Sequence, residues 1–339
     1  MLPTMFLRPF RPSTRSAYGI TRHQVVRFSS TDGQSNSRTR PDSLVNPPAS
    51  TRPPPLNLPS RDPAASRITH YFHLGKAYVN FYKSGLKAVL ANRKLLRERL
   101  QTVDPGDRPR ILFKTTVPRS FSRADWVLTW RVRHDVARLP IFGLVLLICG
   151  EFTPLVVLLV DGLVPFTCRL PQQIGASLEK ARGRRNDSFQ HLEHLRAASG
   201  RPLTQAMARK HVLRSLHLVS GFWDRVGFMP SALWHLKGSL RVSFIEADDE
   251  LLLKAGGVSD LEAEEVKLAC ADRGIDVMGR KDGELRQVLG DWLRLTTAED
   301  RNERLKRLTV LLTTRYGLLS FSPAVLTDST IPQTGKVAP

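Results

Sequence analysis

The chain has 339 residues and a formal net charge of +20 at pH 7, and 41% of its residues are hydrophobic. This length and composition allow one or two folded units with tails, and the positive charge points to an anionic partner such as nucleic acid, a ribosome or anionic lipid. Three widely separated cysteines, with nine histidines that lack companion ligands, argue against a disulfide framework and a metal site. No phosphate loop, nucleophile elbow or other catalytic motif occurs, so we expect neither an enzyme nor a cofactor.

The N-terminal residues have the composition of a targeting segment. Residues 1–30 contain several arginines and no acid, and Arg27-Phe-Ser-Ser30 resembles a matrix-processing site. This pattern predicts a mitochondrial transit peptide, and a disordered basic arm is the alternative. Residues 31–67 are rich in Ser, Pro and Arg and predict an extended, disordered linker.

Residues 68–124 are predicted to hold a basic amphipathic helix and a loop. From Ile68 to Leu100, apolar residues recur at three- and four-residue steps with lysines and arginines between them. Such a helix next to a membrane segment either lies on anionic lipid or packs on the rest of the protein. Pro105-Gly106 marks the loop that follows.

Residues 125–170 are predicted to form a membrane segment with its span at about 139–160. A basic helix carries Trp126 and Trp130 as expected interfacial anchors, and leads into the apolar run Leu139 to Val160. At about 1.5 Å per residue this run would reach about 33 Å as a helix, enough to cross a bilayer. A buried core helix is the alternative. Basic residues flank both sides of the run, so charge does not decide its orientation.

Glu151 is the most conspicuous residue of the run, because an acid at mid-membrane depth is costly and marks a candidate functional site. Pro140 lies where we expect the spanning helix to begin. Pro154 is interior, and predicts a kink that frees the carbonyl of Gly150 beside Glu151. Two oxygens at one depth suit a cation or a proton, and Asp161 is a second candidate just beyond the run. The alternative is an internally paired acid that packs one helix against another.

Residues 171–320 are predicted to be all helical, with a disordered tail at 321–339. Ser259 and Glu262 form a capping-box pattern that opens a helix, which is expected to end at Arg273-Gly274. A second helix covers 284–295 with Leu285, Leu289, Trp292 and Leu293 on one face. Two short helices joined by an extended turn resemble the SAP-type helix-extended-helix unit, and a plain helical hairpin is the alternative. Residues 203–240 are a possible degenerate copy.

Three segments in this order resemble the mitochondrial LETM family of inner-membrane proteins. The segments are Arg138-Leu-Pro140 with Glu151-Phe-Thr-Pro154 and Leu163-Val-Pro-Phe-Thr167, then Ala247-Asp-Asp-Glu-Leu251, then Gly257 to Gly274 with Trp292-Leu293. The resemblance is to a short, divergent branch: Glu151 and Pro154 are one residue closer than in the family, Asp161-Gly162 replaces an aromatic-proline pair, and neither an EF-hand loop nor a long C-terminal coiled coil occurs.

The resemblance implies an all-α protein with a single transmembrane helix, followed by a Letm-type ribosome-binding domain at 171–320 that faces the matrix. It also implies binding to the mitochondrial ribosome, contact with inner-membrane lipid, a possible homo-oligomer, and a linked role in cation/proton homeostasis and mitochondrial organisation. Lys and Arg side chains are the expected ribosome contacts. The candidates are Lys180, Arg182, Arg184, Arg185, Arg209, Lys210 and Arg214.

Two other functions stay open. One is a subunit of a K⁺ or Ca²⁺/proton exchanger that uses Glu151, which would require oligomerisation or a partner because one span cannot enclose an aqueous path. The other is a soluble matrix protein that binds nucleic acid through the SAP-like unit.

Overall fold

A computed structural model describes residues 43–59, 67–107, 117–149, 164–199, 205–216 and 231–313. Within these ranges the chain is helical and contains no strand, which confirms the all-α class. Apart from two short 3₁₀ turns, η1 (Ala49–Thr51) and η3 (Phe166–Cys168), the elements are α-helices. They are α1 (Arg67–Gln101), α2 (Arg123–Cys149), α4 (Pro171–Ser199), α5 (Gln205–Ser215), α7 (Ser231–Lys254), α8 (Ala263–Asp272), α9 (Asp282–Thr296) and α10 (Arg301–Thr313).

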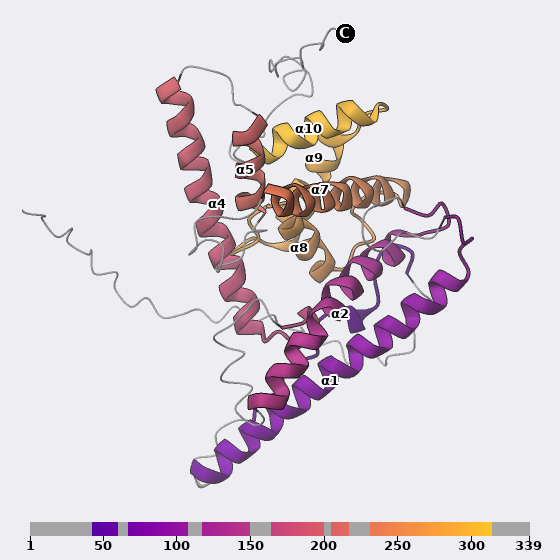
Figure 1. The fold of residues 1–339 in the computed structure, drawn as a ribbon, viewed down its shortest axis with the longest axis vertical. Coiled ribbons are helices and arrows are strands. Elements are labelled where there is room, and N and C mark those ends of the chain that lie inside the picture. The colour runs from indigo at the N-terminus through magenta and orange to yellow at the C-terminus, as the bar shows by residue number, and fades with distance from the viewer. Residues whose placement is uncertain are drawn as a thin grey trace, which may run out of the picture.

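Helices α1 and α2 form a long antiparallel pair (Figure 1). Near one end of the pair the rings of Tyr82 and Phe142 lie 6.2 Å apart. Further along, Leu96 packs with Leu128 and Val132. The start of α1 and the end of α2 therefore project in the same direction. The predicted helix at 68–100 is confirmed, with bounds one residue longer at each end.

Helix α2 corrects two expectations. It runs through Pro140 without a break, so the prediction that a new helix begins at this proline is wrong. Trp126 and Trp130 are not interfacial anchors, because both stack on Phe244 of α7, with ring centroids 6.2 Å and 4.4 Å away. The indole N–H of Trp126 also donates to the Phe244 carbonyl at 3.4 Å. Periodicity alone could not reveal that α7 crosses α2 at this level.

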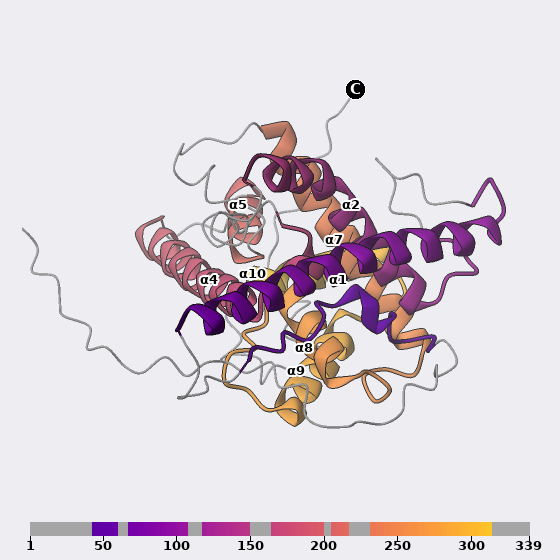
Figure 2. The ribbon, with the colours of Figure 1, turned by 90° about the horizontal axis from the view of Figure 1, so that it is seen from below.

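Residues 43–59, which we expected in a disordered linker, pack on the folded domain instead. They run between α1 and α8 (Figure 2), and the Val45 and Thr51 side chains are buried. The Asn46 side-chain amide donates to the Asp260 carbonyl at 2.7 Å, and the Asn46 side-chain oxygen accepts from the Glu262 amide at 2.9 Å. A Pro- and Ser-rich composition predicts low helix propensity, but it does not predict whether a folded surface is present for the segment to pair with.

The segment before α4, which includes η3, contacts both α1 and α2. The Asp135 carboxylate of α2 accepts from the amides of Phe166 at 2.6 Å and Thr167 at 3.4 Å. Gly85 of α1 lies against the same turn, where an added Cβ would come within 2.7 Å of the Thr167 carbonyl oxygen. Only glycine therefore permits this close approach. Proline at the first position of α4 then starts the next helix.

The main core joins α2, α5, α7, α8, α9 and α10. All four apolar residues predicted for the second short helix are buried in it, which confirms that helix and its inward face. The predicted capping box is wrong. Glu262 is itself the N-cap of α8 without a side-chain cap bond, and the Ser259 hydroxyl donates to Asp260 at 3.4 Å.

In the described part of the chain, no helix is both long enough and apolar enough to cross a membrane. Glu151, Pro154 and Asp161 lie outside the described residues, as do residues 1–42 and 314–339, which contain the expected transit peptide and tail.

Candidate functional site

The α8–α9 unit is built around a tight helix end. The Ile275 amide donates to the Cys270 carbonyl at 2.9 Å and the Gly274 amide to the Ala271 carbonyl at 3.1 Å, which together make a Schellman motif. Gly274 has φ of +76°, a conformation that glycine adopts without strain. This turn directs the chain back so that Leu285 and Leu289 of α9 face the core next to α8.

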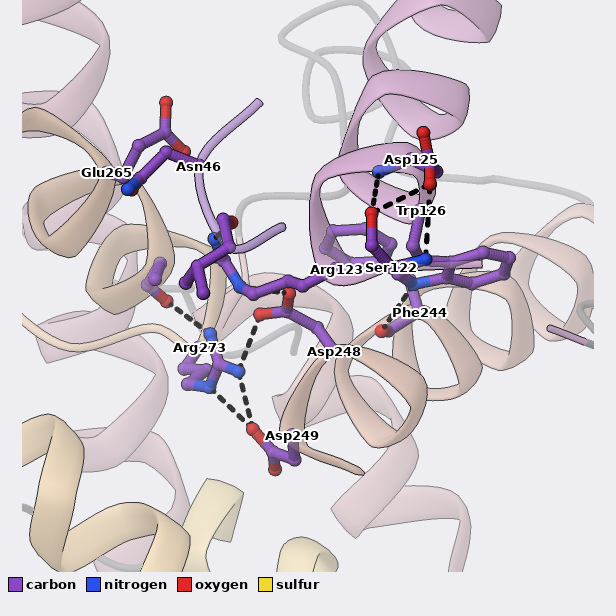
Figure 3. Close-up of polar contacts among 12 residues, drawn as sticks. Asn46, Ser122, Arg123, Asp125, Trp126, Phe244, Asp248, Asp249, Glu265 and Arg273 are labelled. Atoms are coloured by element: carbon purple, nitrogen blue, oxygen red, sulfur yellow. Dashed lines mark hydrogen bonds and ion pairs between the residues drawn. The ribbon is translucent and has the colours of Figure 1, made fainter. Parts of the chain in front are cut away.

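A buried ionic network fixes this unit to α7 (Figure 3). The Arg273 guanidinium is fully buried and donates to Asp248 at 2.7 Å, to Asp249 at 2.9 Å and to the Ala269 carbonyl at 2.9 Å. The Asp249 carboxylate also accepts from the Trp292 indole at 2.9 Å. The Ala247-Asp-Asp-Glu-Leu251 segment is thus explained by structure, because its two aspartates hold Arg273 at the end of α8.

The same network reaches α2. Arg123 forms an ion pair with Asp248 at 2.9 Å, and both side chains are 2% exposed. Burial by itself would raise the pKa of Asp248, but Arg123 and Arg273 together lower it below its ordinary value. Burial dominates at Asp249 and raises the pKa of that carboxyl. A second buried pair joins Arg131 of α2 to Glu265 of α8 at 2.8 Å.

The predicted ribosome contacts lie on two adjoining helices, α4 and α5, which pack side by side (Figure 1). Ser188 hydrogen bonds with His211 at 2.9 Å and Arg185 donates to the Ser215 carbonyl at 3.2 Å, so the helices are antiparallel. This register brings the first arginines of α4 near the end of α5. We call the set the α4–α5 basic face; its members are Lys180, Arg182, Arg184, Arg185, Lys210 and Arg214. Arg209 is also on α5, but its side chain lies outside the described ones.

The structure divides these cations into two kinds. Lys210 and Arg214 are exposed and stand four residues apart on α5, so they share one side of that helix. Arg182 is 48% exposed, but it pairs with Asp276 in the α8–α9 turn at 3.2 Å. Arg185 is partly buried and caps the end of α5 through the Ser215 carbonyl. Arg182 and Arg185 therefore hold α4 against the domain as well as adding charge.

Sequence reasoning missed two cations in the α8–α9 turn. Arg280 and Lys281 are exposed, and Lys281 is the N-cap of α9. Their turn contacts α4 through Asp276 and Arg182, so it adjoins the α4–α5 basic face. The sequence did contain a signal for them: two cations stand directly before a helix, and the N-terminus of a helix also favours an anion.

The side chains of His211, Cys168 and Cys270 are buried in the described part of the chain. His211 is a core residue that hydrogen bonds with Ser188 and with the Leu312 carbonyl at 3.1 Å. Burial raises the pKa of both the Cys168 and Cys270 thiols to about 12. Among the described residues there is no group of His, Cys, Asp and Glu able to hold a metal ion.

The described residues form a helical domain with exposed cations on α4 and α5 and a buried ionic network in its core. Residues 205–313, from α5 to α10, match the family model described as LETM1-like, RBD. The chain therefore carries a LETM1-like RBD domain, and this match supports its resemblance to the LETM family. No curated protein and no solved structure matches the chain. The matched range includes Arg209, Lys210 and Arg214, but it begins after α4, which carries the other four predicted contacts.

Proposed function

We propose that this protein binds the mitochondrial ribosome through the α4–α5 basic face of its C-terminal domain while it is held at the inner membrane. The carrying observation is that the family domain presents two exposed cations, Lys210 and Arg214, on helix α5, whose other side packs on the core. Ribosomal RNA is a polyanion, and contacts of this kind bind it with little sequence preference and a strong dependence on salt.

Co-sedimentation of the full-length protein with mitochondrial ribosomes from detergent-solubilised membranes, across a salt series, tests the proposal. The variant Lys210→Glu/Arg214→Glu should weaken association and lower the slope of log affinity against log salt by about 2. A matched control is Lys94→Glu/Arg97→Glu, which reverses two exposed charges on α1. Equal loss in both variants, or no association at low salt, would contradict the proposed contact.

Membrane association is proposed from the apolar run and the family resemblance, with the C-terminal domain on the matrix side of the inner membrane. Alkaline carbonate extraction distinguishes this from the soluble alternative, because an inserted protein stays in the pellet. The predicted domain boundaries at 30, 67, 124, 170 and 320 belong to the same proposal, except that residues 43–59 pack on the folded domain. The SAP-like character of the α8–α9 unit is proposed with them.

We also propose a linked role in cation/proton homeostasis, with Glu151 as the titrating group, Asp161 as a second candidate and Pro154 as the kink beside it. The support is the resemblance of the Glu151 segment to the family's membrane acid. Glu151→Gln should abolish cation/proton exchange in mitochondria and leave ribosome association unchanged. If exchange also persists, Glu151 is a packing residue.

A further inference from the structure

Residues on the two sides of the apolar run share one hydrophobic core. Val45, Trp126 and Val127 precede the run, and they are buried in the same cluster as Phe244 and Trp292, which follow it. A single crossing of a bilayer would place these two groups on opposite sides of the membrane. They cannot then pack together.

Buried charges join the same two parts of the chain. Arg123 pairs with Asp248 at 2.9 Å and Arg131 with Glu265 at 2.8 Å, and none of these four side chains is more than 11% exposed. Arg52 adds a more exposed pair with Glu262 at 2.6 Å. Separation across a membrane would take Arg123 from Asp248 and Arg131 from Glu265, and would leave buried charges of a kind that proteins avoid.

The ends of the run also meet. Phe142, near its start, lies in one buried cluster with Val164, just after its end. A straight helix from residue 142 to residue 164 would hold them about 33 Å apart. Two full crossings would need about 40 residues, and only residues 143–163 lie between them. Both ends of the run therefore lie at this cluster, on one side of the membrane.

We propose that α1 and the C-terminal domain lie on the same side of the inner membrane, with the apolar tip of α2 in the adjacent lipid leaflet. The end of α2 supplies the entry point, where Leu147 is 82% and Ile148 is 73% exposed. The start of α1 projects in the same direction and exposes Ile68 and Phe72. Lys76, also exposed, comes next along α1, where it can bind lipid phosphates. The occupant of this apolar tip is lipid, since the tip adjoins the most apolar stretch of the chain.

This arrangement replaces the single pass expected from the sequence. It rests on the proposed membrane location and is independent of the ribosome contact, so either can fail alone. It predicts that a site before the run and a site after it always have the same accessibility across a sealed membrane.

Single cysteines at Ala91→Cys in α1 and Thr309→Cys in α10 report on the two sides. Both positions are exposed, and the full-length background carries Cys149→Ser, while the native Cys168 and Cys270 are buried. An impermeant maleimide is applied to intact mitoplasts, where orientation is uniform, and then again after detergent. We expect both cysteines to be protected together and both to react after detergent. Labelling of only one of them before detergent overturns the inference.

Insertion is tested on the same membranes by carbonate extraction. The wild-type chain should remain in the pellet, whereas Leu147→Glu/Ile148→Glu should move most of the protein to the supernatant. The control Leu253→Glu introduces an acid at an exposed leucine of α7 and should leave the protein in the pellet. Release of the wild-type chain, or equal release of the control, overturns insertion through the α2 tip.

Discussion

Replacing Arg273 with methionine should destabilise the C-terminal domain more than any exposed substitution. The guanidinium is fully buried, and its loss removes the hydrogen bonds to Asp248, Asp249 and Ala269. Breaking one partner out of a buried pair costs about 3–5 kcal/mol. Asp248 keeps Arg123 at 2.9 Å, so we place Arg273→Met near the lower end of that range. The melting temperature should fall by about 10 °C, at about 2–4 °C per kcal/mol.

Urea unfolding of the detergent-solubilised full-length chain, followed by tryptophan fluorescence, measures this loss. The matched control is Arg294→Met, because Arg294 is 57% exposed and pairs with Asp291 at 3.2 Å; it should cost less than about 1 kcal/mol. Adding Asp249→Asn to Arg273→Met removes the stranded charge, keeps an acceptor for the Trp292 indole and should restore part of the stability. If Arg273→Met unfolds within about 1 kcal/mol of the wild type, the network is not a major source of stability and the reasoning fails.

Three further outcomes follow from single contacts. Arg123 and Arg273 lower the pKa of Asp248, so its charge stabilises the folded state. The stability advantage of the wild type over Asp248→Asn should therefore be full above about pH 4 and decline as pH falls through the lowered pKa. Urea unfolding at a series of pH values measures this. Gly85→Ala should cost about 1–3 kcal/mol, since the new methyl would meet the Thr167 carbonyl oxygen at 2.7 Å; a neutral result in thermal unfolding would contradict that contact. In Cys149→Ser protein, the two remaining buried thiols should resist a maleimide until urea unfolds the chain, and rapid labelling under native conditions would refute their burial.

The amino-acid sequence determined the helical class, the bounds of α1 to within one residue and the inward face of α9, because these depend on local periodicity and on glycine at a helix end. It also indicated the LETM-type domain that the family model matches, since the Asp248-Asp249 segment and the α8–α9 stretch occur in a fixed order. Local patterns carry this information without reference to any distant residue.

Only the tertiary structure decided which polar and apolar residues have partners. The sequence around Trp126 is typical of a membrane anchor, but in the fold this side chain packs on α7. The composition of residues 43–59 is typical of a linker, but in the fold they pair with the residues that precede α8. Arg182 and Arg185 could not be separated from Lys210 by composition, because their partners Asp276 and Ser215 are distant in sequence. The common side of the membrane proposed for α1 and the C-terminal domain has the same origin. It follows from a core shared by residues more than a hundred positions apart, which no local pattern encodes.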